Sequence, residues 1–364
     1  MAEDVRPVLT RLAAEVGLST VHVARFDGHD KAPDADAYDA WVASGMHADM
    51  SYLARGSDVR RNPALRLDDT RSVAVFSLRH AHQRPADPGG STGHVARYAW
   101  GRDYHNLFGK RLVRLMKRLR AEGIGCWGGV DTAPILERKW ARLAGAGFTG
   151  KNCLTIVPAN TSWMFLGTVF LNAHATPDPP LVRDHCGTCT RCLVACPTDA
   201  FTGPYTLDAR RCISYWTIEA RGLAPRPLRP GFGRWLFGCD VCQEVCPHNT
   251  RPPPPDSDDL LPRNAWLDCV TLLNSPDDAL IERFTGTPLR RPGGTGLKRN
   301  ALIVLGNLGD DGVVDTVREQ LVHSSEVVRA AAVWCLQQLG DSRVQQHVDT
   351  SDVVNQELRF TDHG

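Results

Sequence analysis

Residues 186–197 read CGTCTRCLVACP, an ungapped CxxCxxCxxxCP pattern. In ferredoxins with two clusters, the first three cysteines of this pattern bind one 4Fe-4S cluster, and the fourth, which precedes proline, binds the other. A second stretch, CDVCQEVCP at 239–247, has the last three cysteines of the pattern and lacks the first. Cys212 lies between the two stretches and is the natural replacement for the missing ligand.

These eight cysteines divide evenly into two sets of four. The first set would be Cys186, Cys189, Cys192 and Cys246, and the second Cys196, Cys212, Cys239 and Cys242. Zinc is the competing metal, because paired CxxC motifs also form tetrahedral structural sites. A zinc ribbon needs neither the third cysteine nor the two CP endings, so the pattern predicts two 4Fe-4S clusters and electron transfer. The remaining cysteines are scattered, and we expect them to be small buried residues: Cys126, Cys153, Cys269 and Cys335.

The composition is that of a soluble globular protein with more than one domain. The chain has 364 residues, of which 42% are hydrophobic and 23% charged, with a net charge of +1. No run of eighteen apolar residues is present, and the N-terminus lacks a signal-peptide pattern. We therefore expect a cytoplasmic monomer without a membrane segment, in which cysteines are metal ligands or free thiols rather than disulfides.

The first half of the chain alternates between helix and strand patterns. Short apolar runs predict buried strands at 72–78, 154–157 and 166–171, and leucines at helical spacing predict a helix over 107–119. This alternation favours an α/β sheet. The basic face of the helix is either solvated or turned toward phosphate groups. The first half of the chain contains no GxGxxG motif after a predicted strand, which argues against a standard nicotinamide-binding or flavin-binding fold.

Residues 128–138 read GGVDTAPILER and offer two interpretations of Asp131. Asp131 or Thr132 could cap a helix that begins near Pro134. Alternatively, Asp131 is a functional carboxyl group at the end of a strand, where open α/β sheets bind ligands. The spacing alone does not choose between the cap and the functional group.

The C-terminal part is helical and weakly repetitive. Leu297, Leu302 and Leu305 align with Val328, Val333 and Leu336, and Gly309-Asp310 aligns with Gly340-Asp341. The offset predicts two helical-hairpin repeats of the HEAT type, which stack and expose an extended face. The alternative is two unrelated amphipathic helices.

Several long stretches resemble the epoxyqueuosine reductase family. They are MSYLAR at 50–55, ARYAWGRDYH at 96–105, VDTAPILER at 130–138, GKN at 150–152, SWMFLG at 162–167, RRCISYWTIE at 210–219 and GCDVCQEVCPHN at 238–249. The stretch ERFTGTPLRRPGGTGLKRNALIVLGNLGD at 282–310 resembles the helical-repeat domain of that family. The resemblance covers nearly the whole chain.

The resemblance implies a fold and a reaction. Members of the family reduce epoxyqueuosine to queuosine at the wobble position of tRNA, with electrons passed through two 4Fe-4S clusters to cobalamin. The implied architecture is a reductive-dehalogenase-like α/β cobalamin-binding domain at 1–180, a ferredoxin-like two-cluster domain at 181–250 and a HEAT-like repeat domain at 256–364. Asp131 would be the general acid, because loss of the epoxide oxygen as water needs protons and burial can raise the pKa of a carboxyl group.

The resemblance also implies binding residues and partners. Polar contacts to cobalamin would come from Arg55, Asn152, Ser162, Ser214 and Asp240, although each could equally be a loop or cap residue. The tRNA surface would combine the helix over 110–120 with four basic residues of the tail: Arg290, Arg291, Lys298 and Arg299. A low-potential electron donor of unidentified nature completes the expected partners.

Two other functions compete with this interpretation. The first is another cobalamin and iron–sulfur reductase, such as a dehalogenase, but dehalogenases usually carry an export signal and lack a helical-repeat tail. The second is a ferredoxin-type electron carrier, which would leave the first half of the chain unexplained. Cobalamin binding separates the carrier from the reductases, and a requirement for tRNA separates the two reductases.

Overall fold

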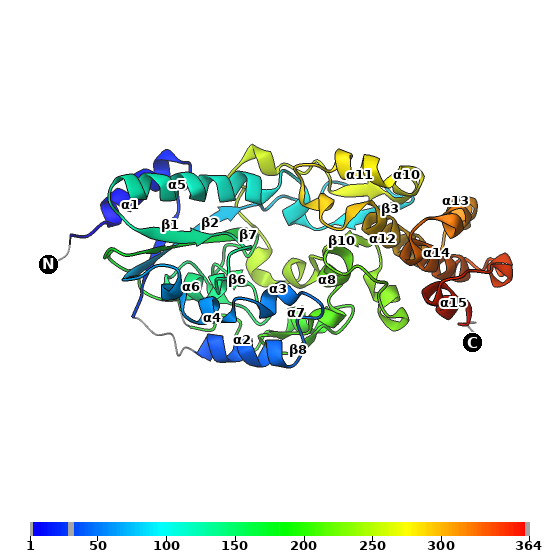
Figure 1. Ribbon diagram of the computed structural model, residues 1–364, viewed down its shortest axis with the longest axis horizontal. Helices are drawn as coiled ribbons and strands as arrows, with labels where there is room; N and C mark the ends of the chain where they lie inside the picture. Colours follow the sequence, from blue (N-terminus) through cyan, green and yellow to red (C-terminus); the bar gives the residue numbers. More distant parts are fainter. Residues whose placement is uncertain (1–2, 28–32, 182, 361–364) are drawn as a thin grey trace.

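The computed structural model describes residues 3–27, 33–181 and 183–360. Two bodies are evident in Figure 1, a sheet flanked by helices toward the N-terminus and a helical array toward the C-terminus. None of the helices in the described ranges is long and apolar enough to span a membrane.

A four-stranded sheet with the order β1-β2-β7-β4 forms the centre of the N-terminal body. The strands β2 (Ser72–Arg79) and β7 (Met164–Leu171) pair along their whole length, as their apolar runs predict. The outer strands are β1 (Val21–Arg25) and β4 (Cys126–Gly129). All three pairings are antiparallel, unlike the parallel sheet that alternating helices and strands favour. Apolar patterning identifies strands but not their direction. The direction of β7 depends on where the chain returns to the sheet after the long segment between Arg79 and Met164.

The run at 154–157 is not part of this sheet. It forms only β6 (Thr155–Ile156), which pairs with β5 (Phe148–Thr149) in a separate small hairpin. The sheet is covered on one face by α1 (Arg6–Glu15) and α5 (Lys110–Ala121), and on the other by α6 (Glu137–Leu143), as Figure 1 shows.

Helix α5 confirms the predicted helix and explains part of its basic face. Leu112, Leu115 and Leu119 are fully buried against the sheet. On the outer side, Arg111 donates a hydrogen bond to the carbonyl oxygen of Gly17, and Arg118 forms an ion pair with Glu15. These arginines therefore help to hold α1, rather than forming a free basic surface.

A second, three-stranded sheet joins the three parts of the chain. Its order is β10-β3-β11, with β3 (Thr92–Val95) in the centre, β10 (Trp235–Phe237) on one side and β11 (Trp266–Asp268) on the other. Each strand comes from a different one of the ranges 1–180, 181–250 and 256–364. A single hydrophobic core extends from this sheet into the C-terminal helices, so the three ranges do not form three independent cores.

The 31-residue offset of the tail is present in the structure. Helices α12 (Gly293–Leu308) and α14 (Glu326–Gln338) pack together, and the aligned leucine and valine pairs are buried. Each helix ends at a glycine with a left-handed conformation, Gly309 at φ 68° and Gly340 at φ 71°. The following aspartates, Asp310 and Asp341, each accept a hydrogen bond from a backbone N–H two residues later.

Shorter elements complete the fold. We call residues 186–249, which contain the motif cysteines, the cysteine segment. The shorter elements of the N-terminal body and the cysteine segment are α2 (Pro33–Ala43), α3 (Ser51–Ala54), α4 (Ser57–Arg61), α7 (Arg191–Val194), β8 (Phe201–Gly203), β9 (Thr206–Leu207), α8 (Ile213–Ile218) and α9 (Val241–Glu244). Those in the tail are α10 (Cys269–Asn274), α11 (Asp277–Arg283), α13 (Val314–Glu319) and α15 (Asp352–Leu358).

The last helix is fixed to the cysteine segment by a buried ion-pair cluster. Glu357 of α15 accepts hydrogen bonds from Arg229 and Arg226, each at 2.6 Å in its shortest contact. All three side chains are largely withdrawn from water, with 8%, 3% and 14% exposure respectively. The Glu357 carboxylate is thus shared as a counter-charge by two guanidinium groups.

Removal of that carboxylate should weaken the attachment of the tail. We expect Glu357→Ala to lower the free energy of unfolding of the tail by about 3 kcal/mol, because it leaves Arg229 buried without a counter-charge. Urea unfolding followed by tryptophan fluorescence measures the change. The exposed Glu319, replaced by alanine, is the matched control; equal midpoints for the two variants would contradict the expectation.

Candidate functional site

The eight motif cysteines lie near one another in the structure. None of the twelve cysteines forms a disulfide. Burial raises the pKa of Cys192 to about 11, with a further contribution from the neighbouring thiols of Cys186, Cys246 and Cys189. We call these four residues the outer thiol group. Of the remaining cysteines, Cys126, Cys269 and Cys335 are buried as expected, whereas Cys153 is half-buried.

The other four cysteines form the inner thiol group. Burial raises the pKa of Cys239 far above its usual value, and the nearby thiols of Cys212 and Cys196 act in the same direction. The same holds for Cys242, whose neighbours include Cys239 and Cys212 of its own group and Cys192 of the outer group. The two groups are therefore adjacent. Thiols that resist ionisation in this way become thiolates when a metal supplies positive charge.

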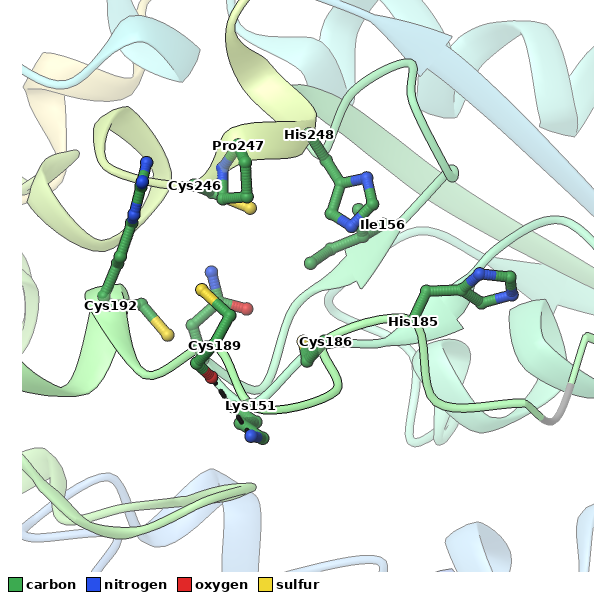
Figure 2. Close-up of a pocket in the computed structure, with 11 residues that line it drawn as sticks. Lys151, Ile156, His185, Cys186, Cys189, Cys192, Cys246, Pro247 and His248 are labelled. Atoms are coloured by element: carbon green, nitrogen blue, oxygen red, sulfur yellow. Dashed lines mark hydrogen bonds between the residues drawn. The ribbon is translucent and has the colours of Figure 1, made fainter.

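A cavity of about 50 Å³ lies at the outer thiol group. Figure 2 shows Cys189, Cys192 and Cys246 around this common space. The amine of Lys151 donates hydrogen bonds to the carbonyl oxygens of Gly187, at 2.5 Å, and Cys189, at 3.0 Å, which fixes the first CxxC loop. Among the described residues, no three His, Cys, Asp or Glu side chains lie close enough to hold one metal ion.

Two of the predicted cofactor-binding residues attach the N-terminal body to the cysteine segment. The side-chain amide of Asn152 donates to the carbonyl oxygen of Cys242 at 3.3 Å. The hydroxyl of Ser162 hydrogen-bonds to Gln243 at 2.9 Å and accepts from Asn249 at 2.7 Å. Both side chains are buried. They hold the loop that carries Cys242 and Cys246 against the start of β7.

A third, Asp240, has its carboxylate occupied within the protein. It is 2% exposed and accepts hydrogen bonds from the backbone and side chain of Arg97, at 2.9 and 3.1 Å, and from Arg84 at 3.2 Å. Burial raises the pKa of Asp240 to about 6. The Arg84 guanidinium lies 5.0 Å from the ring of Trp235, with two further tryptophan rings nearby. Asp240 thus holds the guanidinium groups of Arg97 and Arg84 beside Cys239.

The last two predicted cofactor contacts differ in position. Burial raises the pKa of Cys212, and hydrogen bonds from the backbone and hydroxyl of Ser214 oppose that rise. Ser214 therefore lies directly against an inner-group thiol. Arg55 is exposed at the end of α3, where its carbonyl oxygen accepts a hydrogen bond from Arg60 at 2.7 Å.

Asp131 is not a helix cap. Helix α6 begins only at Glu137, with Leu136 at its N-cap and no side-chain hydrogen bond there. Asp131 instead adopts a left-handed backbone conformation, φ 39°, directly after β4, and its N–H donates to the Glu137 carboxyl at 2.8 Å. Non-glycine residues held in this region often mark functional sites. The cap interpretation is therefore wrong.

Two aromatic residues, which the sequence analysis had not singled out, hold the Asp131 carboxylate. The hydroxyl of Tyr104 donates a short hydrogen bond to it, and Nε2 of His105 lies 3.4 Å from the same oxygen. Nδ1 of His105 lies 2.9 Å from Asp103. Tyr104 also stacks on Phe165, with 4.3 Å between ring centroids. An acidic residue two positions before a histidine, as in RDYH at 102–105, is the signal that could have revealed this pair.

The pKa of Asp131 is lowered, contrary to the expectation of a raised value. Partial removal of the exposed carboxylate from water by its neighbours acts to raise it, but hydrogen bonds from His105 and Tyr104 and the charges of His105 and Arg291 outweigh that effect. Hydrogen bonds to Asp103 and Asp131 raise the pKa of His105 to about 9. Burial and the charge of Asp131 raise the pKa of Glu137 to about 8. At neutral pH the protons of this site therefore reside on His105 and Glu137.

The predicted basic surface of the tail is only partly available. Arg299 is 2% exposed and donates to the backbone carbonyls of Trp216, Ala220 and Gly222, while the amine of Lys298 pairs with Asp277 at 3.3 Å. A role of these two residues in binding an RNA backbone is excluded by their burial.

The remaining two basic residues have a different environment. Arg290 is exposed. Arg291 forms an ion pair with Glu219 at 2.9 Å, lies 6.0 Å from the ring of Tyr52 and contributes to the lowered pKa of Asp131. Arg291 thus belongs to the surroundings of Asp131.

Three family models match parts of the chain. The model described as "4Fe-4S double cluster binding domain" matches residues 185–249, the range that holds both thiol groups. The model described as "Epoxyqueuosine reductase QueG, DUF1730" matches residues 60–132. A model for HEAT repeats matches residues 295–351. The chain therefore contains a 4Fe-4S double-cluster domain, and its tail is similar to HEAT repeats.

Whole-chain comparisons agree with these matches. The chain is 38% identical to the epoxyqueuosine reductase of Pseudomonas aeruginosa, covering 90% of this chain and 91% of that protein. It is 37% identical to that of Xanthomonas campestris, covering 93% and 97%. A crystal structure of an epoxyqueuosine reductase with an epoxyqueuosine-modified tRNA stem loop matches with a TM-score of 0.88 at 26% identity, covering 97% and 96%. The Streptococcus thermophilus structure matches with a TM-score of 0.86 at 26% identity, covering 98% of each chain.

The charge state of His105 can be measured directly. We expect NMR titration to give a pKa of His105 near 9, and both Asp103→Asn and Asp131→Asn to lower it, Asp103→Asn more strongly. Since this pKa lies above the ordinary value of 6.5, the interactions of charged His105 stabilise the fold fully below about pH 6.5. That contribution is lost as the pH rises through about 9. A pKa near 6.5 that neither variant changes would contradict the described pairing.

Proposed function

Because the chain belongs to the epoxyqueuosine reductase family, we propose that it reduces epoxyqueuosine to queuosine at the wobble position of tRNA. Its relatives are oxidoreductases, and so is this chain. The observation that supports the proposal most strongly is the pairing of a double-cluster domain with a carboxylate site held by Tyr104 and His105. The related crystal structure that contains a modified tRNA stem loop supports tRNA as the substrate.

In this proposal the two thiol groups hold the two 4Fe-4S clusters. The outer group would bind one cluster, and the inner group the other. The supporting observation is the arrangement of eight thiols in two adjacent sets of four. Such clusters carry one electron at a time, so two of them in sequence would conduct electrons toward the reaction site.

The residues around the Asp131 site suit a cobalamin cofactor. Several buried polar atoms there have no hydrogen-bond partner among the described residues, among them Nδ1 of His80 and Oγ1 of Thr168. His80 packs on Phe165, which stacks on Tyr104, and Thr168 pairs with Gly129 just before Asp131. Buried polar atoms of this kind suit a ligand rich in amide groups, such as a corrin. Bound cobalamin would supply low-valent cobalt as the source of two electrons.

Of the five predicted cofactor contacts, Arg55 remains the strongest proposal, because the hydroxyl of Ser214 already hydrogen-bonds to Cys212. The side chains of Asn152, Ser162 and Asp240 already hydrogen-bond within the protein. These three would act on the cofactor by holding the cysteine segment in place.

The residues around Asp131 can deliver the protons that the reaction needs. The epoxide gains two electrons and two protons, loses both C–O bonds to the ring, and leaves an alkene and water. Asp131 is 59% exposed in the free chain, and cover by bound tRNA would raise its pKa by removing water. A proton would then pass from Nε2 of His105 to the Asp131 carboxylate and on to the substrate oxygen. Glu137, whose pKa is about 8 and whose carboxyl group accepts a hydrogen bond from the Asp131 N–H, would supply the second proton.

The reaction is tested by an anaerobic assay of the reconstituted chain. We expect the wild type, given cobalamin, a low-potential reductant and epoxyqueuosine-containing tRNA, to yield queuosine, detected by mass after digestion to nucleosides. Asp131→Asn should be slower by about a hundredfold or more with full iron content, because its amide cannot relay a proton.

The outcomes of this assay separate the alternatives. No queuosine despite bound cobalamin and full iron would overturn the tRNA assignment and leave a cobalamin reductase of another kind. No cobalamin binding would favour an electron carrier. Equal rates for the wild type and Asp131→Asn would remove the proposed role of Asp131.

The ligand assignment is tested by iron content. We expect Cys212→Ala to reduce the iron bound after reconstitution from about eight to about four per chain, because it removes one ligand of the inner cluster only. Cys153→Ala is the matched control, since Cys153 is near Cys212 and belongs to neither group. Unchanged iron in Cys212→Ala would refute the assignment.

A further inference from the structure

A wide hollow lies on the surface beside the outer thiol group. It has a volume of about 590 Å³ and is open to solvent. Its lining includes Cys246, Pro247 and Arg191, which also line the cavity between the outer-group thiols. These three residues therefore border both the hollow and the proposed position of the first cluster. We call this feature the outer hollow.

The floor of the outer hollow is apolar. Val194, in the short helix α7, is 80% exposed, and Ala195 and Val245 lie beside it. An apolar side chain with that exposure gains stability only when another surface covers it. Val194 lies between two motif cysteines, Cys192 and Cys196, and therefore close to the cluster-binding segment's ligands.

The charge of the outer hollow is positive. Arg191 is exposed and has no ion pair among the described residues. Arg251, which follows the lining residue Thr250, is likewise exposed without an ion pair in the described part of the chain. The acidic lining residue is Glu244, whose carboxylate is neutralised by Arg97 at 2.6 Å and Arg84 at 3.4 Å. A partner with an acidic surface would be attracted here.

Cys246 of the outer thiol group lines this hollow, and no cysteine of the inner thiol group does. Asp240, which follows Cys239, accepts hydrogen bonds from Arg97, the chain neighbour of the half-buried Tyr98. Tyr98 also packs against Tyr104, which holds Asp131. The hollow therefore borders the outer group, and a chain of contacts through Arg97, Tyr98 and Tyr104 connects the inner group to the Asp131 site.

We propose that the outer hollow is the docking surface of a small acidic protein that carries one electron at low potential, and that electrons enter the chain there. The inference rests on the proposed function. In each encounter, the donor is oxidised by one electron and the outer cluster is reduced by one, without transfer of a proton. Two encounters supply the two electrons that one epoxide consumes. A small apolar floor with a few cations suits the brief, limited contacts typical of redox partners.

The test measures reduction of the clusters, not formation of queuosine. Reduced flavodoxin, an acidic one-electron carrier, is mixed anaerobically with the cluster-loaded full chain, and the loss of cluster absorption is followed. The methyl viologen radical, a small cation, serves as the second reductant. We expect Val194→Glu to slow reduction by flavodoxin about tenfold at low ionic strength and to leave reduction by methyl viologen unchanged. Val194→Lys, which keeps the positive field, should match or exceed the wild type.

Val322→Glu is the matched control, because Val322 is 85% exposed and lies in the tail. Equal flavodoxin rates in Val194→Glu and Val322→Glu would overturn the proposal. So would a loss in Val194→Glu that is the same for flavodoxin and methyl viologen, since it would indicate a damaged cluster rather than lost docking. Failure of the chain to take up clusters would instead count against the proposed function.

Discussion

The rest of the structure depends on two thiol groups, each of which contains one cysteine from the sequence motif that supplies most of the other group. Cys246, from the end of the segment, completes the group that begins with Cys186, while Cys196, from the first motif, joins the later cysteines. Helices α7 and α9 must therefore lie side by side, and they do. Most of the motif thiols are in surroundings that raise their pKa, so their ionisation depends on a metal, and metal binding and folding of this segment are coupled.

The rest of the chain holds this segment from both sides. Lys151, Asn152 and Ser162 bind it from the N-terminal body. Arg299 of α12 fixes the last turn of α8 and the backbone that follows it through three carbonyl groups. Glu357 anchors the end of the tail to the same segment. The tail is thus part of the support of the cluster domain, whatever else its exposed face contacts. In the proposed reaction, electrons enter beside the outer thiol group, and protons are held near Asp131 by His105 and Glu137.

The sequence predicted features that depend on local spacing. The thiol sets follow from a motif in which each ligand lies a fixed number of residues from the next, and the tail repeat follows from paired leucines and glycines at one offset. Sheet direction was not predictable in this way, because it depends on where the chain returns after a long excursion. The pKa of Asp131 depends on Tyr104 and His105, which lie far from it in sequence. Lys298 and Arg299 follow the basic pattern of a surface, yet α12 is covered on several sides and buries them.

The most direct test of this account is electron paramagnetic resonance spectroscopy of the wild-type chain after anaerobic reconstitution, recorded at partial and at full reduction. Two adjacent clusters, one in each thiol group, predict a simple spectrum at partial reduction and a broadened spectrum with magnetic interaction at full reduction. A fully reduced spectrum that is the sum of two isolated clusters, or that contains one cluster only, would contradict the arrangement on which the proposed path of electrons depends.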